Sequence, residues 1–231
     1  MSLKTCTLIK KIPLTNDVWE LHYDLSLFTE MKSWQFITFI MKWIGGRSYS
    51  ILEILNWKIA ILVIKRWGIE DGGRGWSLYL CDAQIGEEFQ YVWPAGHFNL
   101  SEGIKNRLFL GTGTWLVPLY NQILFWLARQ KTEKYQLVFG VRYKKDLYYL
   151  DKFEELKKNY PNTFYYHLIV SRDTNEWIIH NWYVTDFISS NSVKDFEEYY
   201  ICWVPSMIES CEEQLFSLWI KKEQIFFEKY A

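Results

Sequence analysis

The sequence lacks the features that mark several common classes of protein. No apolar run reaches the roughly 18 residues that a membrane-spanning helix needs. Residues 1–11 lack the long apolar core of a secretory signal peptide. Lysine and arginine number 26 against 27 aspartates and glutamates, and the net charge of −1 leaves no basic footprint for a nucleic acid. We therefore expect a cytoplasmic protein with no membrane span and no nucleic-acid partner.

Cysteine is scarce, and its spacing excludes further classes. The chain has four cysteines, Cys6, Cys81, Cys202 and Cys211, and none forms a C-x-x-C pair. An iron–sulfur cluster needs closely spaced ligands, and a reducing compartment argues against a disulfide framework. The four histidines show no H-E-x-x-H spacing, so we expect no metal site. We expect Cys6, Cys81 and Cys211 to be buried small apolar side chains.

Glycine is unusually rare. The 231 residues include 12 glycines and 13 tryptophans, although glycine is among the commonest residues of globular proteins. The chain is otherwise ordinary, with 49% hydrophobic and 23% charged residues, which suits a sizeable core. A mixed fold with many turns ordinarily needs more glycine than this.

The first hundred residues have the pattern of an antiparallel barrel. Short apolar or alternating segments are separated by turn signals, and one short helix is expected at residues 77–82. Several short strands at such spacing are typical of a barrel. The expected strands are residues 3–11, 18–25, 35–41, 58–66 and 88–92.

Beyond about residue 103 the expected strands alternate with helices. This alternation predicts a parallel α/β sheet. We therefore expect two domains, residues 1–103 and residues 104–231. The expected strands of the second are residues 107–110, 135–141, 163–170, 198–202 and 224–228, and its helices are residues 116–129, 146–159 and 206–218.

Three segments of the first domain carry groups suited to a phosphate and an aromatic ring. Residues 47–50 (Arg-Ser-Tyr-Ser) follow the turn Gly45-Gly46 and offer a guanidinium, a flat ring and hydroxyls. Residues 64–66 (Ile-Lys-Arg) end a strand. Residues 72–77 (Gly-Gly-Arg-Gly-Trp-Ser) open the short helix, whose N–H groups suit a pyrophosphate. Taken alone, this glycine run is also compatible with a flexible hairpin turn, which is the less favoured alternative.

Two segments of the second domain share one edge of the expected sheet. Residues 111–118 (Gly-Thr-Gly-Thr-Trp-Leu-Val-Pro) follow a strand and open a helix, which is where an open α/β sheet binds a dinucleotide. The segment is not the G-x-G-x-x-G fingerprint, and no ribose-binding acid follows at the usual spacing. Residues 201–207 (Ile-Cys-Trp-Val-Pro-Ser-Met) end another strand at that edge.

In this order, the segments resemble motifs of the ferredoxin–NADP reductase family over nearly the whole chain. Residues 47–50 look like its flavin motif, and residues 64–66 like its next FAD-contact strand. Residues 73–82 are similar to its pyrophosphate loop and helix. Residues 111–118 resemble its Gly-Thr-Gly-Thr-Gly-x-x-Pro loop.

Four further matches lie in the second half. Residues 140–142 (Gly-Val-Arg) resemble the end of the next strand, and Ser171-Arg172 matches the pair that holds the 2′-phosphate in NADP-using members. Residues 202–207 resemble the Cys-Gly-x-x-x-Met motif. Residues 228–230 (Glu-Lys-Tyr) resemble the Glu-x-Tyr ending.

The resemblance implies a fold and a function. The fold is an antiparallel six-stranded FAD-binding β-barrel followed by a parallel α/β nucleotide-binding domain. The function is a FAD-dependent NAD(P)H oxidoreductase that exchanges electrons with a one-electron carrier such as ferredoxin or flavodoxin. The Ser171-Arg172 pair predicts a mild preference for NADPH, and we expect a monomer. Two alternatives remain open: a flavin reductase subunit of a multicomponent oxygenase or dehydrogenase, and a cofactor-free fold that is inactive in this tryptophan-bearing form.

The resemblance also implies roles for single residues. Arg47 would pair with the FAD diphosphate, and Tyr49 would pack on the isoalloxazine. The residues implied in catalysis are Ser50 near the flavin N5, Cys202 near the nicotinamide, Glu228 for proton handling and Tyr230 covering the flavin. Those implied in FAD binding are Arg47, Ser48, Tyr49, Ser50, Ile64, Lys65, Gly73, Gly75, Trp76 and Ser77. Those implied in NAD(P) binding are Gly111, Thr112, Gly113, Thr114, Trp115, Pro118, Arg142, Ser171, Arg172, Cys202, Trp203 and Met207.

Tryptophan stands where the family motifs have glycine. Trp115 and Trp203 replace motif glycines, and Trp57 follows Asn56 where Asn-Gly is the natural hairpin turn. Our hypothesis is that the source reads UGA as glycine, whereas this translation reads it as tryptophan. The alternative is divergence by real substitution. Trp19 and Trp177 look like genuine tryptophans. Trp34 and Trp93 also stand where the family usually has glycine, and Trp43, Trp76, Trp182 and Trp219 are expected in turns or loops.

Overall fold

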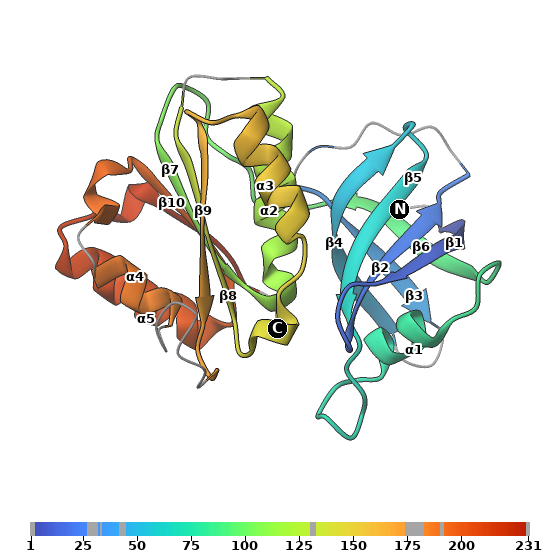
Figure 1. Cartoon of the computed structure of the whole chain (residues 1–231). Coiled ribbons are helices and arrows are strands. Elements are labelled where there is room, and N and C mark those ends of the chain that lie inside the picture. Colours follow the sequence, from blue (N-terminus) through green and yellow to red (C-terminus); the bar gives the residue numbers. More distant parts are fainter. Residues whose placement is uncertain are drawn as a thin grey trace. The chain divides into compact units, whose positions relative to one another are not determined.

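The chain folds into two compact units, Met1–Asn99 and Leu100–Ala231. The computed structural model, traced in Figure 1, describes residues 3–26, 32, 34–41, 45–129, 133–173, 183–189 and 192–229. None of the helices in these ranges is long and apolar enough to cross a lipid bilayer.

The first unit is a closed barrel of six strands in the order β1-β2-β5-β4-β3-β6, in which every neighbouring pair is antiparallel. The predicted six-stranded antiparallel barrel is therefore confirmed. Its elements are β1 (Lys4–Pro13), β2 (Val18–Asp24), β3 (Phe36–Met41), β4 (Gly45–Leu55), β5 (Ile59–Lys65), α1 (Trp76–Asp82) and β6 (Glu88–Ala95).

Side chains fill the interior of the barrel. Along β3 burial alternates strictly, because successive residues of a strand point to opposite faces. Tyr23, Phe39 and Phe89 meet inside, with ring centroids of Tyr23 and Phe89 5.5 Å apart and those of Phe39 and Phe89 5.8 Å apart. Helix α1 adds Trp76 and Leu80 to this core. A packed interior leaves only the surface and rim of the barrel for a ligand.

Strand β4 differs from the expectation. The sequence predicted a turn at Gly45-Gly46 and no strand after it, but both glycines pair with β3, opposite Met41 and Ile40. A Cβ on Gly46 would lie 3.3 Å from Ile40 Cδ1. Gly46 thus allows close packing in the ladder, whereas Gly45 has open space at its Cβ position and a φ of 92°. A glycine pair in a strand is easily mistaken for a turn.

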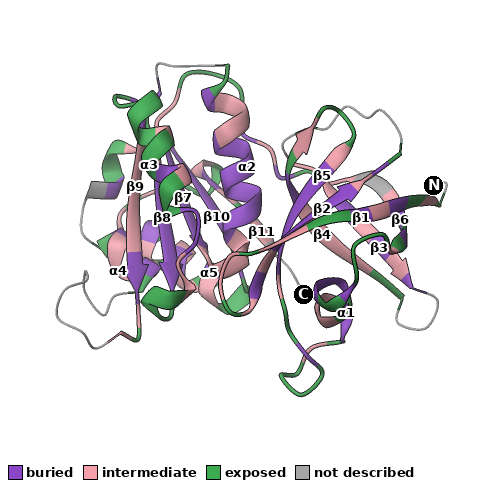
Figure 2. Cartoon of the chain, turned by 45° about the vertical axis from the view of Figure 1, so that its right-hand side comes forward, coloured by how far each residue is buried: buried purple, intermediate pink, exposed green. Residues whose placement is uncertain are grey.

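The second unit is built on a parallel sheet of five strands in the order β11-β10-β7-β8-β9. This confirms the predicted parallel α/β fold. Its central strands are almost wholly buried, as the purple of β7, β8 and β10 shows in Figure 2. The strands are β7 (Arg107–Thr112), β8 (Tyr135–Val141), β9 (Phe164–Val170), β10 (Glu198–Trp203) and β11 (Ile225–Lys229).

Helices cover both faces of this sheet. α2 (Leu116–Leu127) and α3 (Leu150–Asn159) lie on one face, and α4 (Val184–Ser189) and α5 (Pro205–Ser217) lie on the other (Figure 1). The short α4 was not predicted. Short 3₁₀ turns are Gly113–Trp115, Lys144–Asp146, Ser192–Asp195 and Lys222–Gln224.

Helix α3 starts later than the predicted residue 146. Tyr149, directly before the helix, has a φ of 62° and is in the left-handed conformation. That conformation interrupts a right-handed helix. The preceding residues form a separate 3₁₀ turn, closed by the Tyr143 N–H donating to Asp146 Oδ2 at 3.2 Å.

A buried charge cluster joins the amino ends of β7 and β10. Arg107 and Glu198 are direct partners across the two strands, and Arg107 Nε donates to Glu198 Oε2 at 2.9 Å. Arg107 Nη2 also donates to the carbonyls of Ser101 at 2.8 Å and Gly103 at 3.0 Å. The cluster therefore fastens both the strand pair and the segment that enters the sheet.

Candidate functional site

The predicted flavin motif, residues 47–50, lies within strand β4 rather than after a strand. All four residues are half-buried. The Tyr49 ring packs against the barrel core, with its centroid 6.0 Å from that of Phe39, and burial raises the pKa of its phenol. Ser48 Oγ and Thr38 Oγ1 are hydrogen-bonded at 2.8 Å across β3 and β4. The barrel core covers part of the Tyr49 ring. Stacking of the remaining part on an isoalloxazine stays a prediction.

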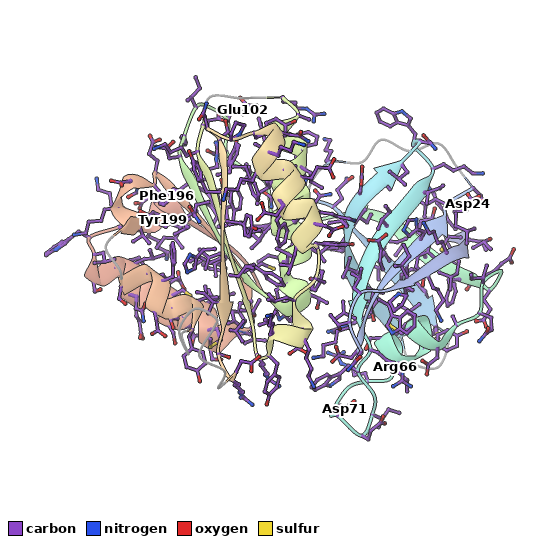
Figure 3. The ribbon with its side chains drawn as sticks, in the orientation of Figure 1. Asp24, Arg66, Asp71, Glu102, Phe196 and Tyr199 are labelled. Atoms are coloured by element: carbon purple, nitrogen blue, oxygen red, sulfur yellow. The ribbon has the colours of Figure 1, made fainter. Side chains whose placement is uncertain are left out.

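The second predicted FAD segment, residues 64–66, is largely occupied by contacts within the barrel. The Ile64 side chain is 2% exposed in the core, so only its backbone is available to a ligand. Lys65 Nζ pairs with Asp17 Oδ2 at 2.9 Å. Arg66, labelled in Figure 3, holds both carboxylate oxygens of Asp82, at 2.7 and 2.9 Å. Hydrogen bonding from Arg66 lowers the pKa of the Asp82 carboxyl.

The glycine loop before α1 has the backbone that glycine permits. Gly75 precedes the helix with a φ of 83°. A Cβ on Gly73 would lie 2.4 Å from Trp67 Cδ1, so a larger residue would displace the loop. Ser77 Oγ donates to the Trp67 carbonyl at 3.2 Å.

Trp76 corrects one expectation. It was expected in a turn or loop, but it is the first residue of α1, and its side chain is 3% exposed in the barrel core. Its indole therefore points away from any ligand on the loop, and only its backbone N–H remains for a phosphate.

The predicted nicotinamide loop stands at the carboxyl edge of the second sheet, where the parallel strands end. A Cβ on Gly111 would lie 2.8 Å from Leu119 Cδ1, so glycine allows α2 to approach β7. Gly113 has a φ of 50° and open space at its Cβ position. Tyr148 Oη donates to the Gly113 carbonyl at 2.9 Å. Thr112 and Thr114 flank this glycine and are half-buried.

Two helices begin at the carboxyl edge without a side-chain cap. Helix α2 follows Trp115 and carries the buried Pro118 in its first turn, where a missing N–H costs little. Helix α5 follows Val204 and begins with Pro205. Part of the first turn is used locally, since the Leu116 N–H donates to the Gly113 carbonyl and the Met207 N–H donates to the Val204 carbonyl at 3.1 Å. The helix dipole favours an anion at both helix starts.

Cys202 lies between two predicted site residues. In the sheet register it is opposite Gly111 of β7 on one side and Glu228 of β11 on the other. Its thiol is fully buried, and burial, with the nearby Glu228 carboxylate, raises its pKa well above the usual value. The thiol is therefore uncharged at neutral pH. Tyr230 lies outside the described residues.

The two tryptophans at family glycine positions both contact the apolar cluster of the second unit. Trp203 ends β10 and is 8% exposed within this cluster, and Trp115 is half-buried against it. Met207, in the first turn of α5, also packs there. These indoles occupy the start of α2 and the end of β10.

Two arginines come together at the end of neighbouring strands. The Ser171 N–H donates to the Val141 carbonyl at 3.0 Å, and the Arg172 N–H donates to the Arg142 carbonyl at 2.8 Å. Both Arg142 and Arg172 are exposed. Sequence reasoning placed each arginine separately, and the sheet register brings them side by side.

Two supporting residues escaped the sequence reasoning. Tyr148 holds Gly113 from 35 positions away, and Asp173 Oδ2 accepts the Lys144 N–H at 3.0 Å. In both bonds the partner is a backbone group, which leaves no signal in residue type.

Three of the four cysteines are placed as the sequence predicted. Cys6, Cys81 and Cys211 are buried free thiols, as predicted, and burial raises the pKa of each to about 12. Over the described ranges, no group of three or more His, Cys, Asp or Glu side chains is arranged to hold a metal ion.

Comparison with known proteins points to reductases. Residues 109–213 match the family model "Oxidoreductase NAD-binding domain". A curated relative, the electron transfer component of 2-halobenzoate 1,2-dioxygenase from Burkholderia cepacia, is 29% identical over 152 residues, which are 64% of this chain and 44% of the relative. The match thus spans less than half of that relative.

Solved structures resemble the chain over nearly its whole length. A cytochrome P450 reductase from Amycolatopsis has a TM-score of 0.87 at 22% identity, covering 99% of this chain and 69% of that one. Ferredoxin-NADP+ reductase from Plasmodium falciparum, solved with 2′P-AMP, has a TM-score of 0.80 at 23% identity, covering 99% and 96%. The chain therefore has the ferredoxin–NADP reductase-like fold, and its second unit matches the oxidoreductase NAD-binding domain family over residues 109–213.

Proposed function

We propose that this chain is a FAD-dependent NAD(P)H oxidoreductase that exchanges electrons with a one-electron carrier such as ferredoxin or flavodoxin. One observation carries the proposal. The carboxyl edge of the parallel sheet combines the glycine loop at Gly111–Gly113, two uncapped helix N-termini and two exposed arginines. An open α/β sheet binds nucleotides at this edge.

The barrel domain, predicted as residues 1–103, would hold the flavin. Arg47 supplies a half-buried guanidinium for the diphosphate, and the loop ending at Gly75 supplies backbone N–H groups. Ser50 supplies a hydroxyl for a polar atom of the flavin ring. Bound FAD supplies the acceptor for a hydride and the means to release its electrons one at a time. The residues fit FAD because cation, hydroxyl and glycine backbone occur together on one barrel.

The second domain, predicted as residues 104–231, would hold the nicotinamide cofactor. The start of α2 binds the pyrophosphate, and Arg142 and Arg172 bind a 2′-phosphate, which underlies the mild preference for NADPH. Cys202, fully buried beside Gly111 and held neutral by that burial, adds no charge to the edge that would receive the nicotinamide. Glu228 is half-exposed beside it and can hold a proton.

Two variants of this function differ in the partner. The Burkholderia relative is an electron transfer component of a dioxygenase, which favours a role as the reductase subunit of a multicomponent oxygenase. In the other variant the chain passes electrons to a free carrier such as ferredoxin and acts as a standalone monomer. The four free thiols suit a reducing compartment, so we place the protein in the cytoplasm.

Flavin binding tests the first half of the proposal. Arg47→Ala should lower the FAD retained after reconstitution, because a charge-assisted phosphate contact is lost. Lys10→Ala, at an exposed position of β1, is the matched control and should retain as much FAD as the parent. If no form of the chain binds FAD, including the glycine forms described below, the proposal is wrong.

Coenzyme choice tests the second half. Arg142→Ala and Arg172→Ala should each reduce kcat/KM for NADPH about tenfold or more, and that for NADH little, because only NADPH carries the 2′-phosphate. Lys145→Ala, another exposed cation near this edge, is the control. Equal kcat/KM for both coenzymes in the parent would contradict the NADPH preference.

A further inference from the structure

Two exposed tryptophans have a backbone conformation that bulky residues rarely adopt. Among the described residues that are not glycine, five have a positive φ, and two of these are Trp57 at 58° and Trp219 at 66°. A bulky residue in this region is an outlier, because its Cβ crowds the neighbouring carbonyl oxygen.

Trp57 occupies the glycine position of a tight hairpin between β4 and β5. Asn56 and Trp57 are the two central residues, both with positive φ, and the Lys58 N–H donates to the Leu55 carbonyl at 3.0 Å. Positive φ at both positions defines the type I′ turn, for which Asn-Gly is strongly preferred. The side chain of Trp57 is 53% exposed, so core packing does not offset the conformation.

Trp219 occupies the glycine position that ends helix α5. The Ile220 N–H donates to the Leu215 carbonyl at 3.1 Å, and the Trp219 N–H donates to the Phe216 carbonyl at 2.9 Å. These are the two hydrogen bonds of a Schellman motif, whose left-handed residue is usually glycine. Trp219 is 89% exposed.

Two other bulky residues, Tyr149 and Trp19, pack against neighbouring side chains, and this packing stabilises them. Tyr149 has a φ of 62°, but it is 6% exposed and its ring centroid lies 5.1 Å from that of Tyr148. Trp19, which looks like a genuine tryptophan in the sequence, lies under Lys11 Nζ at 5.2 Å and packs on the barrel core. Trp57 and Trp219 combine the strained backbone with an indole outside the buried core, 53% and 89% exposed.

We infer that the working protein carries glycine at positions 57 and 219, where the backbone has a positive φ, and also at positions 115 and 203. At these two the ground is the family motif alone, because Trp115 has an ordinary right-handed backbone with a φ of −67° and Trp203 is a buried strand residue. A UGA codon read as glycine gives this set with one cause. The part that concerns 115 and 203 rests on the proposed function: glycine there removes two indoles from the carboxyl edge and opens it to the nicotinamide cofactor. The hairpin and helix end depend on no cofactor.

Thermal unfolding of the full chain tests the backbone argument. Trp57→Gly and Trp219→Gly should each raise the melting temperature by about 2–4 °C, because glycine adopts positive φ without strain. Trp57→Ala and Trp219→Ala remove the indole but keep a Cβ, so each should melt below its glycine counterpart. Trp19→Gly and Tyr149→Gly should lower the melting temperature. If the glycine and alanine variants melt together, the inference is overturned.

Calorimetric binding of NADPH tests the cofactor part separately. Trp115→Gly with Trp203→Gly should tighten binding about tenfold or more, while Trp57→Gly with Trp219→Gly should leave it unchanged. Stabilisation at 57 and 219 without any NADPH binding would keep the glycine assignment there and count against the proposed function. The coding DNA decides the cause: TGA is expected at all four positions, and TGG at 57 and 219 would overturn the inference.

Discussion

Replacing Arg107 with methionine should destabilise the second unit severely. The guanidinium is fully buried and holds Glu198 Oε2 at 2.9 Å, with Glu133 Oε1 3.7 Å away. The variant leaves two buried carboxylates without this cation. It also removes the donors to the Ser101 and Gly103 carbonyls. Loss of one partner from a buried ion pair costs about 3–5 kcal/mol, a large share of the 5–15 kcal/mol that stabilises a typical domain.

Urea unfolding followed by far-UV circular dichroism measures this change in free energy. Lys105→Met is the matched control, because Lys105 contacts the same carboxylate at 2.6 Å from a position where its side chain is 34% exposed. We expect it to cost about 1 kcal/mol or less. The double variant Arg107→Met/Glu198→Met should be more stable than Arg107→Met alone, since it removes a buried carboxylate that is left with only the partly exposed Lys105 as its cation.

The same variant should weaken NADPH binding. Arg107 and Glu198 set the register that places Cys202 opposite Gly111 at the far end of the same two strands. A loss of stability below about 1 kcal/mol in Arg107→Met would refute the assigned role of the cluster.

Three further outcomes follow from single contacts. Tyr148→Phe removes the hydrogen bond to the Gly113 carbonyl and should weaken NADPH binding about fivefold, near 1 kcal/mol, as calorimetry would show; unchanged affinity would count against Tyr148 as a positioning residue. Gly140→Ala places a Cβ 2.6 Å from Val184 Cγ2 and should cost about 1–3 kcal/mol in urea unfolding; a neutral effect would show that α4 gives way easily. Burial alone raises the pKa of Glu198, but hydrogen bonds from four neighbours outweigh it and hold the pKa below the ordinary 4.5. Its stabilisation is therefore present above about pH 4.5 and is lost as the pH falls through the lowered value; Glu198→Gln should unfold with a shallower acid-side slope, and an unchanged slope would contradict this.

Local sequence patterns predicted most of the fold, because buried residues recur along the chain with the period of a strand or a helix. Burial alternates along β3 because only one face of that strand packs on the core. Burial is continuous along β10 because both of its faces are covered. Strand β4 escaped because Gly45-Gly46 has the composition of a turn, although pairing with β3 decides its conformation. The start of α3 escaped because Tyr149 adopts a left-handed conformation that its residue type does not announce.

The candidate sites divide in the same way. Motif order in the sequence was enough to predict a flavin-type barrel followed by a nicotinamide-type sheet, and to single out Trp115 and Trp203. Only the tertiary structure placed Trp76 in the core and left Trp219 in solvent, because burial depends on elements far apart in the chain.

By itself, then, the sequence determined the two fold classes, most elements and their order, and the motif glycines, but not β4 or α4. The tertiary structure decided which side chains meet, because strand register sets contacts between distant residues. That register brings Arg142 beside Arg172 and Cys202 beside Gly111. The tertiary structure also revealed the positive φ of residues 57 and 219, a backbone conformation that glycine adopts without strain and tryptophan does not.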